Sequence, residues 1–284
     1  MEDNVMMGLN YDEPVFRPPA EAYSLIFQVT LGCSWNRCAF CEMYKTKQFL
    51  VRKEAEVLCE IQHAARFYGG VRKIFLADGN ALVLSTARLL RILAAIKQFF
   101  PDVARISAYA LPKDLATKSD DELTALRLAG LELVYIGIES GDEDVLRMVN
   151  KSESVGSTLT GILKAQKAGI KCSVMIVNGL AGQEYSHQHA VNSAKLLNEI
   201  QPLFFSTLVL MLPYGIEKYQ QEFKGSYVPM NTAELLIELE LLLENTQLER
   251  TIFRSDHASN SLPLKGNLPR DKEKLLQTIR HTYS

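Results

Sequence analysis

Three cysteines within nine residues carry the strongest chemical signal in the chain. Cys33, Cys38 and Cys41 stand in the segment Cys-Ser-Trp-Asn-Arg-Cys-Ala-Phe-Cys, directly after an apolar run that ends at Leu31. Thiolate sulfur is a soft ligand that favours zinc or an iron-sulfur cluster. A fourth ligand of the usual kind is missing nearby. An open metal position is typical of a reactive site, so the spacing predicts a reactive metal centre.

Composition sets broad limits on the class of protein. The 284 residues are 47% hydrophobic and 23% charged, with a net charge of −2 and a pI near 6.2. These values are ordinary for a globular protein and give no overall field that would attract nucleic acid or an anionic membrane. Nucleic acid is therefore an unlikely partner. One dense basic cluster lies near the cysteines and reads first as a solvated loop: Lys45, Lys47, Arg52 and Lys53.

The sequence also indicates the cellular compartment of the protein. Its N-terminus has acidic residues and no signal pattern, and no stretch approaches the roughly 20 apolar residues that span a bilayer. The five cysteines do not resemble a disulfide framework. We expect a cytoplasmic protein with no membrane partner.

Short apolar runs and helical patterns alternate along the chain, which predicts an α/β fold of parallel strands and crossover helices, curved into an open or closed barrel. The six runs are 24–30, 73–77, 105–110, 133–138, 172–177 and 204–212. After about residue 216, we expect a helix over 232–247, a polar turn-rich stretch and a final helix over 271–280. The predicted organisation is an N-terminal segment (1–21), a barrel (22–216) and a C-terminal extension packed on it (217–284).

Polar residues and glycines follow the predicted strands, at the face where parallel α/β barrels place their active sites. Glu139 directly follows an apolar run and is costly to bury without a partner, so it is expected to face a ligand or a donor. The alternative is a helix N-cap formed by Ser140 and Asp142. The other strand-end residues are Asp78, Gly79, Asn80, Gly141, Asn178, Gly179, Pro213 and Gly215, and Ser107 lies inside the third run.

These residues together resemble a radical S-adenosylmethionine (SAM) enzyme. The cluster loop of that family reads C-x3-C-x2-C with an aromatic residue before the third cysteine, and Phe40 holds that place here. The first gap is one residue longer than the pattern, so the loop must bulge. Further resemblances run along residues 22–215: Asp78-Gly79-Asn80 at a Gly-Gly-Glu position, Gly137-Ile-Glu-Ser-Gly141 with Asn150-Lys151, Asn178-Gly-Leu-Ala-Gly-Gln183, and Leu212-Pro-Tyr-Gly215.

The resemblance implies a six-stranded partial (β/α) barrel of the TIM type, in which Cys33, Cys38 and Cys41 hold a four-iron four-sulfur cluster. It implies reductive cleavage of SAM to a 5'-deoxyadenosyl radical that removes hydrogen from an unidentified substrate. A donor such as flavodoxin or ferredoxin would supply the electron. Trp35 would help to keep the cluster dry. The implied cofactor-binding residues are Phe40, Asp78, Gly79, Asn80, Ser107, Glu139, Ser140, Asn178, Leu212 and Pro213.

Three alternatives remain open. A zinc site would need Cys59 with His63, or Cys172, as a further ligand. A haem carrier or chaperone built on the same fold would use His187, His189 or His257. The polar tail is either a substrate contact or lid, or an ordered cap that satisfies its own backbone; its residues are Arg254, Asp256, His257, Asn260 and Lys265.

Overall fold

Helices and strands alternate through the computed structural model, which describes residues 9–283. The strands are β1 (Leu25–Gln28), β2 (Thr30–Leu31), β3 (Leu50–Val51), β4 (Lys73–Ala77), β5 (Arg105–Tyr109), β6 (Leu131–Glu139), β7 (Lys171–Asn178), β8 (Phe204–Val209), β9 (Thr251–Ser255) and β10 (Leu264–Leu268). The helices are α1 (Glu54–Ala64), α2 (Thr86–Phe99), α3 (Pro112–Thr117), α4 (Asp120–Leu128), α5 (Glu143–Met148), α6 (Val155–Lys167), α7 (Gly182–Ile200), α8 (Ile216–Glu222), α9 (Thr232–Glu244) and α10 (Lys272–Tyr283), with 3-10 turns η1 (Pro19–Glu21) and η2 (Ala81–Val83).

The chain divides into two compact units. Unit 1 holds the residues up to Asn36 together with Met43–Tyr135 and Lys164–Lys171, and unit 2 holds Arg37–Glu42, Ile136–Leu163 and the residues from Cys172 onward. Strand β6 begins in unit 1 and ends in unit 2. The strand order is β1-β4-β5-β6-β7-β8-β9-β10, so the sheet has two ends and is not a closed barrel. The predicted α/β class and partial barrel are confirmed.

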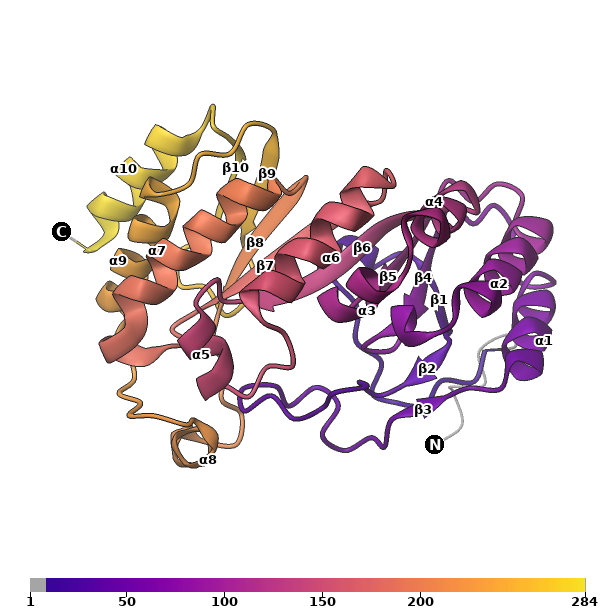
Figure 1. Cartoon of the computed structure of the whole chain (residues 1–284), viewed down its shortest axis with the longest axis horizontal. Helices are drawn as coiled ribbons and strands as arrows, with labels where there is room; N and C mark the ends of the chain where they lie inside the picture. Colours follow the sequence, from indigo (N-terminus) through magenta and orange to yellow (C-terminus); the bar gives the residue numbers. More distant parts are fainter. Residues whose placement is uncertain (1–8, 284) are drawn as a thin grey trace. The chain divides into compact units, whose positions relative to one another are not determined.

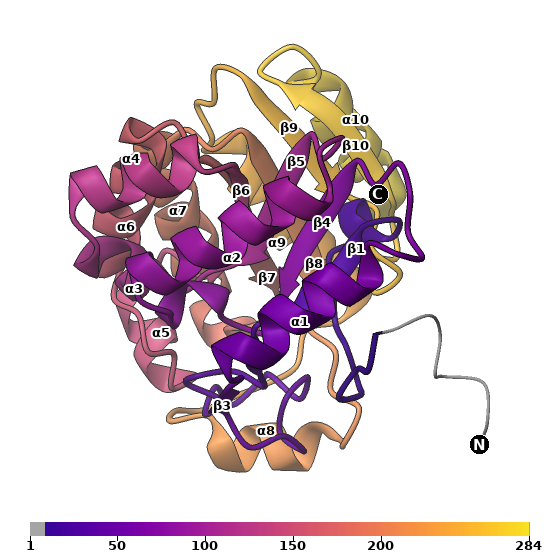
Figure 2. The same cartoon turned by 90° about the vertical axis from the view of Figure 1, so that its right-hand side faces the viewer.

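Unit 1 is built on parallel strands and two long crossover helices. Strand β1 pairs with β4, and β4 with β5, in parallel register. Helices α1 and α2 lie side by side (Figure 2). The buried residues of α2, which include Leu89, Ile92, Leu93 and Ile96, recur every three to four positions. This spacing forms one apolar face that packs inward.

A buried carboxylate ties η1 to the sheet within unit 1. Glu21 is fully buried, and it accepts hydrogen bonds from Arg105 Nη2 and Tyr135 Oη, each at 2.6 Å, and from Ser24 Oγ. Burial raises the pKa of Tyr135, and the neighbouring Glu21 raises it further. Because Arg105 and Tyr135 belong to β5 and β6, this network fixes η1 against the sheet.

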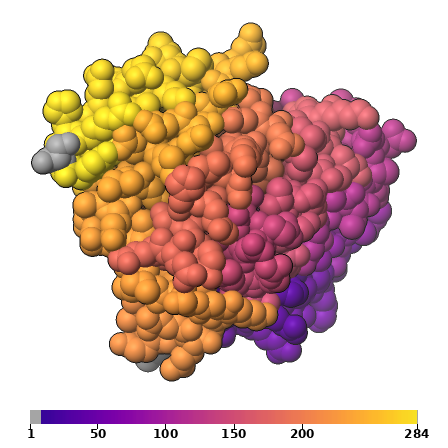
Figure 3. All heavy atoms as spheres, turned by 60° about the vertical axis from the view of Figure 1, so that its left-hand side comes forward, coloured from indigo at the N-terminus to yellow at the C-terminus, as the bar shows by residue number. Residues whose placement is uncertain are grey.

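Unit 2 covers one face of its strands with helices. Helix α9 packs between α7 and α10 (Figure 1). The outer surface of α10 lies beside that of α9, as the yellow and orange atoms in Figure 3 show. Gly266 of β10 lies close under α10, because a Cβ on it would come within 3.1 Å of Leu275. Asn231 and Glu234 form a capping box that begins α9.

Two strands of the polar tail were not predicted. Strand β9 pairs in parallel with β8, and β10 pairs antiparallel with β9. Only alternate residues of β9 are fully buried, at Thr251, Phe253 and Ser255. The predicted helices on either side are present as α9 and α10. The tail therefore extends the sheet beyond the six predicted strands.

None of the helices in residues 9–283 combines the length and the apolar composition needed to cross a bilayer.

Candidate functional site

The cysteines of the loop divide between the two units. Cys33 lies in unit 1, whereas Cys38 and Cys41 lie in the segment Arg37–Glu42 of unit 2. No disulfide joins any of the five cysteines, all of which lie within residues 9–283. Cys38 and Cys41 form one tight turn, in which the Cys41 amide donates to the Cys38 carbonyl at 3.3 Å. In unit 1, the Lys113 ammonium lies 5.2 Å from the ring centre of Trp35.

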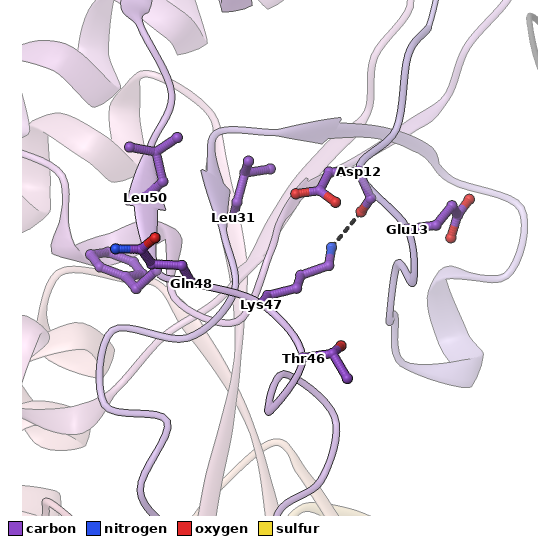
Figure 4. Close-up of a pocket in the computed structure, with 8 residues that line it drawn as sticks. Asp12, Glu13, Leu31, Thr46, Lys47, Gln48 and Leu50 are labelled. Carbon is purple, nitrogen blue, oxygen red and sulfur yellow. Dashed lines mark hydrogen bonds between the residues drawn. The ribbon is translucent and has the colours of Figure 1, made fainter.

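In unit 1, the side chain of Asp78 is already occupied. Its carboxylate accepts hydrogen bonds from Lys47 Nζ, Gln28 Nε2 and the Gly32 amide, each at 3.0 Å. Lys47 also donates to the Asp12 carbonyl (Figure 4). Both charged side chains are almost fully buried. A ligand contact at position 78 is therefore left to the backbone.

Gly79 and Asn80 follow Asp78 directly after the end of β4. A Cβ on Gly79 would come within 2.7 Å of the Tyr44 ring and 3.0 Å of Cys33 Cβ, so glycine allows the end of β4 to approach the cysteine loop. Asn80 Nδ2 donates to Ser34 Oγ at 2.9 Å and to Asp114 Oδ2 at 2.6 Å. Its amide holds the residue next to Cys33. The predicted contact Ser107 is fully buried, with its hydroxyl 3.5 Å from the Ile74 carbonyl.

In unit 2, the segment that bears Cys38 and Cys41 is fixed on both sides. The Ala39 amide donates to the Val149 carbonyl at 2.9 Å, and Lys218 pairs with Glu42 at 2.7 Å. Phe40 packs with this segment against an apolar cluster. The buried members of that cluster are Ala39, Val145, Val149, Val177, Leu180, Ala181, Tyr219, Phe223 and Tyr227.

Glu139 forms a buried ion pair at the end of β6. Its Oε1 lies 3.1 Å from Lys151 Nζ, and the two side chains are 7% and 6% exposed. Burial lowers the pKa of Lys151, but the charges of Glu139 and Cys38 outweigh burial and raise it. The φ of Glu139 is +61°, a left-handed conformation that costs an ordinary residue about 1–2 kcal/mol. Its carboxylate lies over Gly137, where a Cβ would come within 2.9 Å of Glu139 Cδ.

Two buried acceptors at the ends of neighbouring strands have no partner among residues 9–283. They are Glu139 Oε2 at the end of β6 and Asn178 Oδ1 at the end of β7. Both residues are at most 5% exposed. A buried polar atom without a hydrogen bond is costly, and such atoms are expected where a ligand supplies the missing donor.

Asp142 forms the helix N-cap that the alternative interpretation of this turn predicted, whereas Ser140 bonds to His189 and to the Asp142 amide. Asp142 accepts from the Val145 amide and begins α5. Burial raises the pKa of Asp142, but hydrogen bonds from that amide and from Asn192 outweigh it and lower the pKa. Ser140 Oγ lies 2.8 Å from His189 Nδ1, and His189 Nε2 lies 3.1 Å from the Val177 carbonyl. A carbonyl only accepts, so Nε2 carries the proton and Ser140 donates to Nδ1.

The loop after β8 is the most exposed part of the predicted site. Leu212 packs against the apolar cluster, whereas Tyr214 is 63% exposed. The Lys218 ammonium lies 4.9 Å from the Tyr214 ring centre. Pro213 lies between Leu212 and Tyr214. Because Lys218 also pairs with Glu42, the Tyr214 ring lies beside the segment that bears Cys38 and Cys41.

The polar tail caps the end of β8. Asn260 Oδ1 accepts from the Val209 amide at 2.9 Å, and Asn260 Nδ2 donates to the Thr207 carbonyl at 3.0 Å. Ser259 Oγ accepts from the same Val209 amide, and it lies 2.8 Å from His257 Nδ1. These contacts of Asn260 and His257 agree with the alternative in which the polar tail is an ordered cap.

The basic cluster is mostly ion-paired within unit 1. Lys47 is buried against Asp78, Arg52 pairs with Glu60 at 2.8 Å, and Lys53 pairs with Glu56 at 3.2 Å. The phosphate groups of a nucleic acid would have to compete with these carboxylates for the basic side chains.

No set of three His, Cys, Asp or Glu side chains in the described part of the chain converges on a single metal ion. Cys172 is 1% exposed, and burial raises the pKa of its thiol to about 12. A thiol held in its protonated form is a poor zinc ligand. Cys59 is exposed on α1.

Comparisons with known proteins agree on one family. The radical SAM superfamily matches residues 27–196. Heme chaperone HemW of Bacillus subtilis is 22% identical over 62% of this chain and 46% of HemW, and GTP 3',8-cyclase of Marinobacter nauticus is 29% identical over 55% of this chain and 46% of the cyclase. The chain therefore spans less than half the length of these relatives.

The solved structure of coproporphyrinogen III oxidase (HemN) from Escherichia coli superposes with a TM-score of 0.61 and 21% identity, over 78% of this chain and 52% of HemN. That structure is described as a radical SAM enzyme and shares the fold of this chain. The superfamily match extends from β1 into α7 and so includes all three cysteines of the loop and the ends of β4 to β7. The chain belongs to the radical SAM superfamily.

Proposed function

We propose that this chain is an enzyme that holds a four-iron four-sulfur cluster through Cys33, Cys38 and Cys41 and cleaves SAM reductively. The cluster and SAM are the cofactors of the superfamily. The observation that carries the proposal is the cysteine loop within the matched region, together with the two unpartnered buried acceptors at the ends of β6 and β7.

The residues present fit these cofactors. Glu139 Oε2 and Asn178 Oδ1 can only accept hydrogen bonds, and SAM offers ribose hydroxyls and an ammonium group as donors. We assign both acceptors to SAM, with the backbone of Asp78 and Gly79 at its methionyl end. Lys151 supplies a buried positive charge close to Cys38, which favours the thiolate form that binds iron.

When bound, the reduced cluster supplies the electron that splits SAM into methionine and the 5'-deoxyadenosyl radical, which takes a hydrogen atom from substrate. The residues of this chain position the cofactors and exclude water from them. Ala39 belongs to the apolar cluster, Phe40 packs against it, and Cys38 is buried, which limits water near the Cys38 sulfur atom. We propose flavodoxin or ferredoxin as the electron donor. We also propose that the protein is located in the cytoplasm, where thiols stay reduced.

The test is anaerobic reconstitution with iron and sulfide, followed by reduction with SAM and measurement of 5'-deoxyadenosine. We expect product from the wild type and none from Cys38→Ala, which should also lose bound iron and sulfide. Cys59→Ala is the matched control, because it removes an exposed thiol outside the loop. A Cys38→Ala protein that retains iron and cleaves SAM would refute the ligand assignment.

A haem carrier is the second candidate, because HemW is among the relatives. One of its expected ligands is engaged, since both ring nitrogens of His189 have partners inside unit 2. Titration of the reconstituted protein with hemin separates the two functions. Tight hemin binding without 5'-deoxyadenosine would favour the carrier.

A further inference from the structure

At β9 and β10, one face of the unit 2 sheet is buried and the other is exposed or half-buried. Phe205, Phe253 and Gly266 are in register across β8, β9 and β10 and are buried, with Gly266 close beneath α10. Side chains alternate between the two faces of a strand, so the residues one position away point to the opposite face. On β8, β9 and β10 these are Ser206, Arg254 and Lys265.

These residues form one row across four strands. Met175 of β7 pairs with Ser206 of β8, Ser206 pairs with Arg254 of β9, and Arg254 pairs with Lys265 of β10. Met175 and Ser206 are half-buried, whereas Arg254 and Lys265 are exposed. The register therefore places two cations side by side at one end of the row.

Two like charges directly opposite each other on antiparallel strands destabilise a sheet. Within the described residues, no ion pair joins Arg254 or Lys265 to a carboxylate. Arg254 Nη1 donates to the carbonyl of Phe253 at 2.7 Å, which leaves the other N–H groups of its guanidinium available. An anion bound between the two side chains would remove this repulsion.

The row lies near the segment that bears Cys38 and Cys41. Val177 and Leu208 follow Met175 and Ser206 by two positions on the same face, and Val177 belongs to the apolar cluster that includes Ala39. Two residues of a strand span about 6.6 Å. The Met175 end of this row therefore lies close to the cysteine segment of the same unit. Arg254 and Lys265 lie two and three strands from Met175, at about 10 and 14 Å.

We propose that Arg254 and Lys265 bind an anionic group, a phosphate or a carboxylate, of the substrate. This inference rests on the proposed function for the identity of the ligand as substrate. Arg254 presents its planar donors and Lys265 a point charge, a combination suited to an oxyanion. The uncharged part of the substrate would extend over Ser206 and Met175 toward the cysteine segment.

The test is calorimetric titration of the reconstituted full chain at low ionic strength with inorganic pyrophosphate and, separately, with succinate. We expect one of the two to bind and thereby to distinguish phosphate from carboxylate. Arg254→Gln and Lys265→Gln should each weaken binding by about tenfold, because each removes a charged hydrogen-bond donor. Lys274→Gln is the control, since it removes the same charge from exposed α10.

Lys265→Glu provides a second readout. It converts the repulsive cross-strand pair into an attractive one, so the anion-free variant should have a higher melting temperature than the wild type. The rise in melting temperature that the bound anion causes in the wild type should be absent from this variant.

The proposal is overturned if neither anion binds at up to about 10 mM. It is equally overturned if Lys274→Gln weakens binding as much as Arg254→Gln. Both measurements are made without SAM. If the reconstituted wild type binds an anion but does not cleave SAM, the proposed function is wrong and the anion site stands. If it cleaves SAM but binds neither anion, the anion site is wrong and the proposed function stands.

Discussion

Replacement of Gly141, in the turn after β6, by alanine tests whether close packing against α7 requires glycine at this position. A Cβ at position 141 would lie 2.6 Å from Ser193 Cα and 2.8 Å from the carbonyl carbon of Asn192, both on the backbone of α7. A backbone cannot rotate away as a flexible side chain can, so α7 would have to shift. The shift would also weaken the hydrogen bond from the Gly141 amide to Ser193 Oγ, which is 2.8 Å long.

The magnitude follows from these two contacts. Overpacking costs about 1–3 kcal/mol, and loss of a hydrogen bond costs about 0.5–1.5 kcal/mol, so we expect the free energy of unfolding to fall by about 1.5–4.5 kcal/mol. The assay is urea unfolding of the protein without cofactors, followed by circular dichroism. Under these conditions no ligand contributes to the difference between the variants.

Gly156→Ala is the matched control for this substitution. Gly156 is exposed on α6, and a Cβ there would find Ser154 Oγ at 3.9 Å as its one close neighbour. Alanine in the middle of a helix is more stable than glycine by about 0.5–1 kcal/mol, so Gly156→Ala, in the first turn of α6, should be stabilised by up to this amount. If Gly141→Ala unfolds at the same urea concentration as the wild type while Gly156→Ala is stabilised, the packing explanation is wrong.

Three further predictions follow from buried groups. Lys151→Met leaves the Glu139 carboxylate buried without its cation and should cost about 3–5 kcal/mol in urea unfolding; a loss below about 1 kcal/mol would contradict the buried pair. Because the pKa of Asp142 is lowered in the folded state, its contribution to stability is present above the ordinary aspartate pKa and is lost as the pH falls through the lowered value. The deficit of Asp142→Asn should therefore shrink from about pH 7 to about pH 3, and a constant deficit would contradict this. Burial raises the pKa of Cys172 to about 12, so iodoacetamide should label exposed Cys59 and spare Cys172 in the native protein, as mass spectrometry would show.

The six core strands were predictable because each is a continuous apolar run with glycine or polar residues at its end. Strand β4 has the predicted bounds, 73–77, and β7 extends the predicted run by one residue at each end. Strands β9 and β10 were missed for a physical reason. Their apolar residues alternate with polar ones such as Arg254 and Lys265, and short alternating segments rich in Ser and Asn resemble turns.

At the site, residue types were predictable and their partners were not. The cysteines and the polar strand ends could be found from local spacing. The pairing of Lys47 with Asp78 joins residues 31 positions apart, and that of Ser140 with His189 joins residues 49 positions apart. Such contacts depend on how strands and helices pack, which local spacing does not encode. The sequence therefore identified Asp78 without showing that its carboxylate is occupied.

A protein shortened at residue 216 would keep all six predicted strands and still be prone to aggregation. Without β9 and β10, the backbone donors and acceptors of β8 that pair with β9 would face water, and Phe205 would lose its ring contact with Phe253. An open strand edge beside exposed aromatic surface is a template for self-association. Attempts to isolate the barrel alone would then yield oligomers or precipitate, and the C-terminal hairpin should be retained in any shortened version of the protein.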